Sequence, residues 1–303
     1  MKKPIQNRHD FVWYFDVKDG NPNGDPNNGN MPRMDFTTQQ GFVTDGCIKR
    51  KIRDYVEDVF DGDAAYNIYV HRGVTLERQN DLACRAVGID GGLAGVNKAR
   101  GKGLELGRKI RDYMCQTFFD IRAFGAVFTT FMTKESSIPD FTHVRGPVQL
   151  GFARSVDPIV PQDVAISRLT LATEAEARTK QTQTMLGQKY VVPYGLYRME
   201  GRISASIAQH VTGLSEEDLT VLWDALLNMF DTSCTSSSGR MVTRKLIIFR
   251  HDSVLGNAPS HKLFERVHAE CVDEKKMPHD FSDYKISINE EDWPDGVTMQ
   301  VMD

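Results

Sequence analysis

Residues 10–30 read DFVWYFDVKDGNPNGDPNNGN. Their first part alternates, with Phe11, Trp13 and Phe15 on one face, and this predicts a strand over residues 10–18 that is apolar enough to be central in a sheet. The run of Asp, Gly, Asn and Pro that follows is typical of turns. We expect it to begin a loop of about 25 residues without regular secondary structure, a length that is more often functional than not in a compact domain.

The loop leads into a predicted helix over residues 46–60, which Thr44 or Asp45 is suited to cap. Apolar side chains recur along this helix at the spacing of 3.6 residues per turn. They are Ile48, Ile52, Tyr55, Val56 and Val59. We expect this stripe to face the core.

Three cations flank that stripe. At about 100° per residue, Lys49, Arg50 and Arg53 fall together on one side of the helix. Such an arc presents an edge that suits phosphate groups. A solvated face on which these cations pair with Asp54 and Glu57 explains the same residues equally well.

Periodicity along the rest of the chain predicts an α+β fold, with a sheet and helices on one face. Residues 166–171 and 189–196 are expected to pair as a long hairpin. A helix that ends near residue 231 is expected to open with a capping box of Ser215 and Asp218. The other expected strands are 65–71, 121–131, 148–156, 202–208, 241–250, 284–289 and 297–302, the other expected helices are 104–119 and 260–272, and residues 72–103 show no clear periodicity.

Charge is unevenly distributed along the 303 residues. The chain has a net charge of −4, which argues mildly against a uniformly basic nucleic-acid binder. Residues 251–303 hold 5 Lys and Arg against 12 Asp and Glu, so residues 1–250 carry a small positive excess. No apolar run of about 20 residues or secretory signal is found, and we expect a cytoplasmic protein with no membrane partner.

Motifs for metals and cofactors are missing from the sequence. The eight His and five Cys are scattered, with no CxxC, HExxH, GxSxG or GxxxxGK pattern. The glycines of residues 101–107 follow GxGxxxG rather than the dinucleotide-binding spacing. We therefore expect no metal and no cofactor.

Six segments together resemble a known family. They are residues 15–26, 32–35, 43–53, 120–127, 145–149 and 192–198. This set is similar to the backbone subunit of type I CRISPR surveillance complexes (Cascade), the Cas-seven family, and most of all to its type I-C branch. The resemblance runs from about residue 8 to residue 270.

The resemblance implies one domain over residues 1–303, with an RRM-like (ferredoxin-like) palm. Large finger and web insertions would lie at about residues 72–103 and a thumb β-hairpin at residues 160–197. The implied function is a non-enzymatic scaffold in antiviral defence. Copies of the chain would polymerise head to tail along a CRISPR RNA as a helical filament, together with other Cascade subunits, and leave the guide bases open to pair with a target DNA strand.

The resemblance also implies which residues contact the guide RNA. The expected RNA-binding residues are Asn21, Asn23, Arg33, Lys49, Arg50, Arg53, Arg122, Arg145, Gln149 and Arg168. Arg122 is expected within a strand. Leu169 or Met185 is the expected thumb residue that wedges between bases and kinks one of them out.

Two alternatives stay open. A type III-like backbone subunit would cleave target RNA, with Asp25 or Asp35 of the loop assisting attack by the ribose 2′-OH. An unrelated α+β oligomer would carry the basic helix by coincidence.

Overall fold

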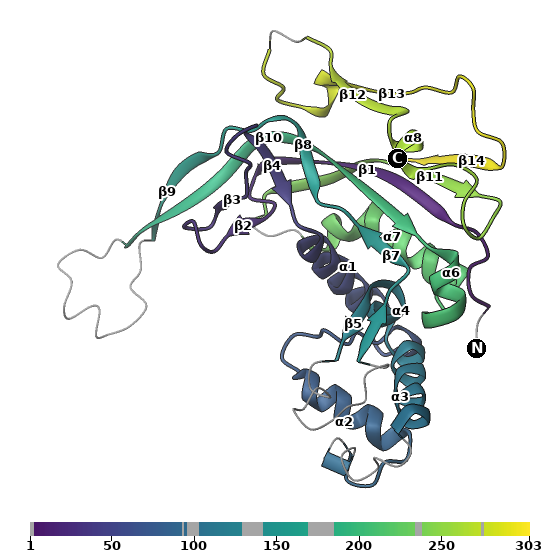
Figure 1. Cartoon of the computed structure of the whole chain (residues 1–303). Coiled ribbons are helices and arrows are strands. Elements are labelled where there is room, and N and C mark those ends of the chain that lie inside the picture. The colour runs from purple at the N-terminus through teal and green to yellow at the C-terminus, as the bar shows by residue number, and fades with distance from the viewer. Residues whose placement is uncertain are drawn as a thin grey trace, which may run out of the picture.

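A computed structural model describes residues 3–92, 94–95, 103–128, 142–168, 185–233, 238–273 and 276–303. Its centre is an eight-stranded antiparallel sheet in the order β14-β11-β1-β10-β8-β4, with β7 and β9 also paired to β10. Helices α1 and α7 lie on one face of this sheet, and α8, β12 and β13 lie on the other (Figure 1). The mixed α/β architecture that was expected is confirmed.

Strand β1 (His9–Gly20) is the axis of this sheet. It pairs with β10 (Met185–Ile203) on one side and β11 (Arg240–His251) on the other. Trp13 packs on one face and stacks on Phe230 of α7, whereas Tyr14 belongs to a separate apolar cluster on the opposite face. The predicted central strand is therefore confirmed. Its side chains point alternately to the two faces of the sheet, and each set is buried in a different apolar core.

Two helices cover the first face, and both begin where the sequence predicted. In α1 (Asp45–Val59) the Thr44 hydroxyl accepts a hydrogen bond from the backbone N–H of Cys47. In α7 (Glu216–Thr232) Ser215 and Asp218 form the expected capping box. The stripe of α1 is buried except for Val59, which lies in the last turn and is half exposed.

The C-terminal segment covers the second face. It contains α8 (Ser260–Phe264), β12 (Val267–Cys271), η5 (Phe281–Asp283) and β13 (Tyr284–Ile288), and the chain ends with the edge strand β14 (Val297–Met302). The prediction of one helix over 260–272 is wrong. After α8 ends, Val267 and Ala269 alternate toward the core and pair with β13.

An insertion between α1 and β7 carries a second apolar core, whose buried residues run from Tyr69 to Val144. Its elements are η1 (Ala64–Tyr66), α2 (Leu76–Ala86), α3 (Gly103–Thr117), α4 (Phe119–Phe124), β5 (Gly125–Val127) and β6 (His143–Arg145). The helix expected over 104–119 is confirmed as α3. The strand expected over 65–71 is wrong, because the 3-10 helix η1 occupies its start. Helix α2 lies within residues 72–103, where the sequence showed no clear periodicity.

Among the described residues, the strand expected over 121–131 is present only as β5, because α4 occupies its first part. In α4 the polar side chains Asp120 and Arg122 alternate with apolar ones, which is the pattern of a strand, but all six residues are buried and the two polar side chains form ion pairs inside the protein. Gly125, at a φ of 76°, ends the helix, since a left-handed conformation is one that glycine adopts without strain.

The long hairpin is present, but its register differs from the expected one, because residues 189–191 pair with 162–164 and residues 192–196 pair with β1 instead. Strand β9 (Gln162–Arg168) pairs with the start of β10, and Arg168 lies opposite Met185. The single strand predicted over 148–156 is divided into β7 (Val148–Leu150) and β8 (Ala153–Pro158).

Two further sequence predictions differ from the structure. Of residues 202–208, only the first two are in a strand, at the end of β10. Ser204 then caps α6 (Ala205–Ile207), which continues into the π-helical turn η4 (Ala208–Thr212). The loop after β1 contains regular structure, namely β2 (Gly24–Asp25), β3 (Met31–Pro32) and the edge strand β4 (Gln40–Val43).

A buried ion pair joins the insertion to α7. Arg122 of α4 contacts Asp218 at 2.8 Å, and the side chains are 8% and 2% exposed. The same guanidinium donates to the carbonyl oxygens of Ala65 and Gln116. Its remaining donors thus hold η1 and α3 close to α7.

We expect Arg122→Met to lower the free energy of unfolding by about 3–5 kcal/mol, because the Asp218 carboxylate would stay buried without its counter-charge. Urea denaturation measures this loss. Arg108→Met, at an exposed position of α3, is the matched control and is expected to change stability by less than about 0.5 kcal/mol. Equal losses of stability in the two variants would contradict a structural role for the ion pair of Arg122 with Asp218.

Stability is also expected to depend on pH through His9. Burial, helped by the positive charge of Arg250, lowers the pKa of His9 to about 4. The unfolded chain therefore binds this proton at a higher pH than the folded one, so stability is full above about pH 6.5 and falls by about 3 kcal/mol as the pH drops to about 4. We expect His9→Gln to flatten this part of the stability curve and the exposed control His261→Gln to leave it unchanged.

Candidate nucleic-acid interface

The loop after β1 is fixed to the start of α1 by Asn23. The Asn23 side-chain oxygen accepts hydrogen bonds from the backbone N–H and the hydroxyl of Thr44, both at 3.0 Å. The Asn23 carbonyl oxygen accepts the N–H of Arg33 at 3.1 Å. Asn23 therefore orders the loop, and its amide nitrogen is the part left to meet a ligand.

Two polar atoms of this loop have no partner. Asn21 donates its side-chain N–H to the carbonyl oxygen of Asn30 at 2.7 Å, but its side-chain oxygen is buried and accepts nothing in the described part of the chain. Arg33 contacts Asp25 at 3.5 Å through Nη2, while its Nε–H is also buried and unpaired there. Buried polar atoms are normally hydrogen-bonded, so each such exception needs an explanation.

The three cations of the predicted arc on α1 all have carboxylate partners, but the partners differ in burial. Lys49 contacts Asp45 at 2.9 Å, and Arg50 contacts Asp54, both within one turn of the helix. These two pairs are partly exposed. Arg50 also keeps one N–H, at Nε, without a partner among the described residues.

Arg53 is held more firmly. Its Nε lies 2.8 Å from Asp120, whose side chain is 1% exposed. Asp120 also accepts the backbone N–H groups of Tyr69 and Val70. The Arg53 guanidinium further lies 5.5 Å from the centre of the Phe124 ring. Arg53 thus joins α1 to the insertion, a role that the helical arc did not reveal.

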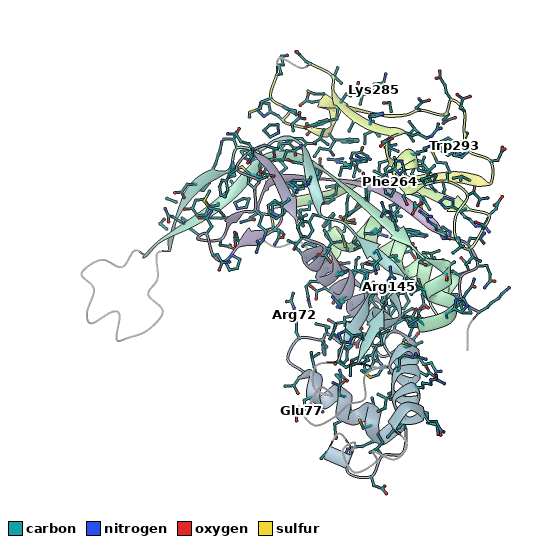
Figure 2. All side chains as sticks on the ribbon, viewed as in Figure 1. Arg72, Glu77, Arg145, Phe264, Lys285 and Trp293 are labelled. Atoms are coloured by element: carbon teal, nitrogen blue, oxygen red, sulfur yellow. The ribbon has the colours of Figure 1, made fainter. Side chains whose placement is uncertain are left out.

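The remaining expected contacts are spread over the palm and the insertion. Arg122 is buried in α4, which corrects its expected place in a strand. Arg145 is exposed in β6, where the insertion meets the sheet (Figure 2). Gln149 of β7 donates to the Gly146 carbonyl oxygen at 2.8 Å. Arg168 and Met185 form the last described pair of the hairpin, and Leu169 lies outside the described residues.

The loop carboxylates do not gather into a metal site. No group of three His, Cys, Asp or Glu suited to a metal occurs among the described residues. The N–H groups of Thr37 and Thr38 donate to Asp35, and these bonds lower its pKa. Arg154, 3.6 Å away, acts in the same direction. Asp35 is therefore a weak base at neutral pH.

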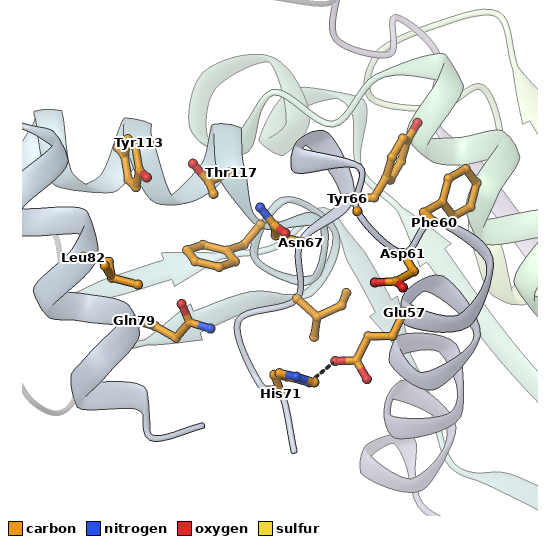
Figure 3. Close-up of a pocket in the computed structure, with 13 residues that line it drawn as sticks. Glu57, Phe60, Asp61, Tyr66, Asn67, His71, Gln79, Leu82, Tyr113 and Thr117 are labelled. Carbon is orange, nitrogen blue, oxygen red and sulfur yellow. Dashed lines mark hydrogen bonds and ion pairs between the residues drawn. The ribbon is translucent and has the colours of Figure 1, made fainter. Parts of the chain in front are cut away.

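A cavity of about 400 Å³ lies between the end of α1 and the insertion (Figure 3). Glu57 and His71 meet across it at 2.8 Å, and Asp61 adds a second carboxylate. Aromatic rings and the amides of Asn67 and Gln79 complete the lining. Its negative charge makes it a poor site for phosphate, so the nucleic-acid candidate remains the loop and the flank of α1.

Comparison with known proteins places the chain in a family. A family model described as CRISPR-associated protein Cas7 matches residues 7–289. A CRISPR-associated protein Cas7 of Haloferax volcanii is 29% identical over 237 residues, covering 73% of this chain and 65% of that protein. The chain thus spans just under two thirds of the length of this curated relative.

Two solved structures match the chain weakly. A chain of a CRISPR RNA-guided surveillance complex in a pre-nicking state has a TM-score of 0.48 at 13% identity, with 80% of this chain and 78% of that chain covered. A chain of the type III-B Cmr-beta complex bound to cognate target RNA has a TM-score of 0.42 at 11% identity, with 80% of this chain and 61% of that chain covered. No described helix is both long and apolar enough to cross a membrane. Since the family model accounts for nearly the whole sequence, this chain belongs to the CRISPR-associated protein Cas7 family.

Proposed function

We propose that this chain is a non-enzymatic backbone subunit of a type I-C CRISPR surveillance complex and binds guide RNA along the loop after β1 and the flank of α1. One observation carries the proposal: among the described residues, Arg33 and Arg50 each keep an unpaired Nε–H, and Asn21 keeps an unpaired acceptor. Guanidinium N–H groups suit phosphate oxygens, and an amide oxygen suits a ribose hydroxyl.

The sheet order supports an RRM-like palm. In chain order, β1, α1, β8, β10, α7 and β11 follow the β-α-β-β-α-β pattern of a ferredoxin-like fold. Their arrangement in the sheet is β11-β1-β10-β8, with both helices on one face. In this proposal the insertion with its own core is the finger and web, and the hairpin of β9 and β10 is the thumb.

The proposed assembly is a helical filament of copies on the CRISPR RNA, together with other Cascade subunits, in the cytoplasm. The backbone grip leaves guide bases free to pair with target DNA, because base pairing rather than protein reads the sequence. Arg168 would contact a phosphate near the thumb tip, and Leu169 or Met185 would wedge between bases. Arg145 and Gln149 would extend the contact along the palm.

We expect the double variant Arg33→Gln with Arg50→Gln to weaken guide RNA binding and to reduce its salt dependence. Each phosphate contact on a single strand contributes about 0.7 to the slope of log K against log salt, so losing two lowers the slope by about 1.4. Fluorescence anisotropy with a labelled guide RNA over a range of salt concentrations measures both. Arg53 is avoided because its loss would leave Asp120 buried without a counter-charge.

The matched control is Arg250→Gln with Lys262→Gln. It removes the same charge from exposed positions on β11 and α8, away from the loop and α1. We expect the control to keep the salt slope of the unmodified chain. If both double variants lowered the slope equally, net charge rather than this site would govern binding.

The second candidate function is cleavage of target RNA, as in a type III-like backbone, with Asp25 or Asp35 near the reacting ribose. Both carboxylates lie in the loop beside the proposed RNA path. Asp35 has a lowered pKa and Asp25 is engaged by Arg33, which suits neither to general-base work.

We therefore expect no cleavage of a complementary target RNA by the chain assembled on guide RNA with Mg²⁺. Gel electrophoresis of end-labelled target measures this. Regularly spaced products that disappear in Asp35→Ala or Asp25→Ala would establish the second candidate and refute the non-enzymatic assignment.

A further inference from the structure

A row of polar side chains crosses the sheet on the face away from α1 and α7. Tyr14 of β1 lies opposite Arg198 of β10, and Arg198 lies opposite Arg154 of β8. Side chains opposite each other in antiparallel strands have Cβ atoms about 4.5–5.5 Å apart. Two arginines in such positions repel each other, and an anion between them would remove that repulsion.

The described counter-charges satisfy these arginines only in part. Arg198 contacts Glu200 at 3.0 Å and donates to the Phe264 carbonyl oxygen at 2.7 Å, both through Nη2. Its Nε–H is buried and has no partner among the described residues. Arg154 has Asp35 at 3.6 Å, and half of its side chain is exposed.

Tyr14 adds a second unused donor. Its side chain is fully buried, and its hydroxyl has no partner in the described part of the chain. Burial raises the pKa of Tyr14 to about 12, so the hydroxyl keeps its proton at neutral pH and is able to donate. A buried hydroxyl without an acceptor lowers stability, and a ligand oxygen would remove that cost.

Tyr14 and Arg198 both line a cavity of about 520 Å³ between the sheet and β12. Its walls include the apolar side chains Val156, Val267 and Ala269. A smaller cavity of about 260 Å³, which contains Arg202, shares residues Gly151 and Glu200 with it. The two form one groove beneath the C-terminal segment, in the region of Phe264 (Figure 2).

We propose that this groove binds a carboxylate side chain from another protein chain, with Arg154 and Arg198 on the charge and the Tyr14 hydroxyl donating to one carboxylate oxygen. The apolar walls suit the methylene stem that carries such a carboxylate. The groove borders the loop after β1, since Gln40 lines it and Asp35 contacts Arg154, but the proposal does not depend on the proposed function.

A protein carboxylate fits better than a nucleic-acid backbone for two reasons. RRM sheets bind RNA by stacking bases on exposed aromatic side chains. Here α8, β12 and β13 cover that face (Figure 1), and Tyr14 is buried beneath them. The covering residues 251–303 also carry 12 acidic against 5 basic side chains, which would repel a polyanion but tolerate one carboxylate.

The test follows the Nε–H NMR signals of the arginines in the full chain, with Arg198 assigned through Arg198→Lys. The probe is the pentapeptide Ala-Lys-Glu-Lys-Ala with acetylated and amidated ends, and the same peptide with Gln in place of Glu is the counterpart that lacks a carboxylate. We expect only the Glu peptide to shift the Arg198 signal. Tyr14→Phe should raise the Kd about tenfold, since a hydrogen bond to a charged group is lost.

Tyr197→Phe is the matched control. The Tyr197 hydroxyl is also buried and has no partner among the described residues, but it lies on the opposite face of β10 and lines none of the groove. We expect its removal to leave the Kd unchanged. Arg154→Gln, at a half-exposed position, supplies a second test should Tyr14→Phe fold poorly, and it too should weaken binding of the Glu peptide.

Several results would overturn the proposal. Equal shifts of the Arg198 signal by the Glu and Gln peptides, or no shift by either peptide, would refute carboxylate binding. Tyr197→Phe weakening binding as much as Tyr14→Phe would show that the effect is structural. A single-stranded oligodeoxynucleotide that shifts Arg198 at lower concentration than the Glu peptide would identify the groove as a nucleic-acid site instead.

Discussion

The burial of β1 on both faces is the constraint on which the rest of this molecule depends. Its odd-numbered side chains from Phe11 to Val17 pack under α1 and α7, and Val12 and Tyr14 pack under the C-terminal segment. A strand buried on both faces needs a layer on each side and a paired strand at each edge. The loop that leaves its end is therefore rigidly anchored at both ends, to β1 and to α1.

Buried carboxylates then decide which cations are available for binding. Asp16, Asp120 and Asp218 are nearly inaccessible, and Arg244, Arg53 and Arg122 respectively neutralise them. Leaving such a carboxylate alone costs more than the pair itself contributes, so these arginines cannot be spared for a ligand. A count of basic residues consequently overestimates the charge that this Cas7 chain is able to offer to RNA.

The sequence predicted those parts of the fold in which local signals agree. The alternation of residues 10–18 and the caps at Thr44 and Ser215 were evident from spacing and residue type, and so was the presence of the long hairpin, although its register was not. The error at α4 arises because Asp120 and Arg122 alternate with apolar residues as they would in a strand. Both polar side chains are buried, and their tertiary contacts select a helix.

At the site, sequence indicated which residues lie near one another but not what each one contacts. Lys49, Arg50 and Arg53 occupy one helical arc as expected, yet Arg53 is tied to a carboxylate 67 residues away. The pairing of Tyr14 with Arg198 and Arg154 depends on the register of three strands that are distant in sequence. No spacing rule gives such a register, because it is set by packing across the whole sheet.

The exposure of each carboxylate separates exchangeable ion pairs from structural ones. Asp45 and Asp54 are 36% and 22% exposed, so water hydrates either one when its cation turns toward a phosphate. Asp120 is 1% exposed, so water does not reach it to hydrate its charge when Arg53 turns away. In the proposed function, RNA binding at α1 would therefore be an exchange of partners by Lys49 and Arg50 around a fixed Arg53. Because the exchange has to offset the loss of two existing pairs, it favours a ligand that engages several phosphates at once over an isolated anion.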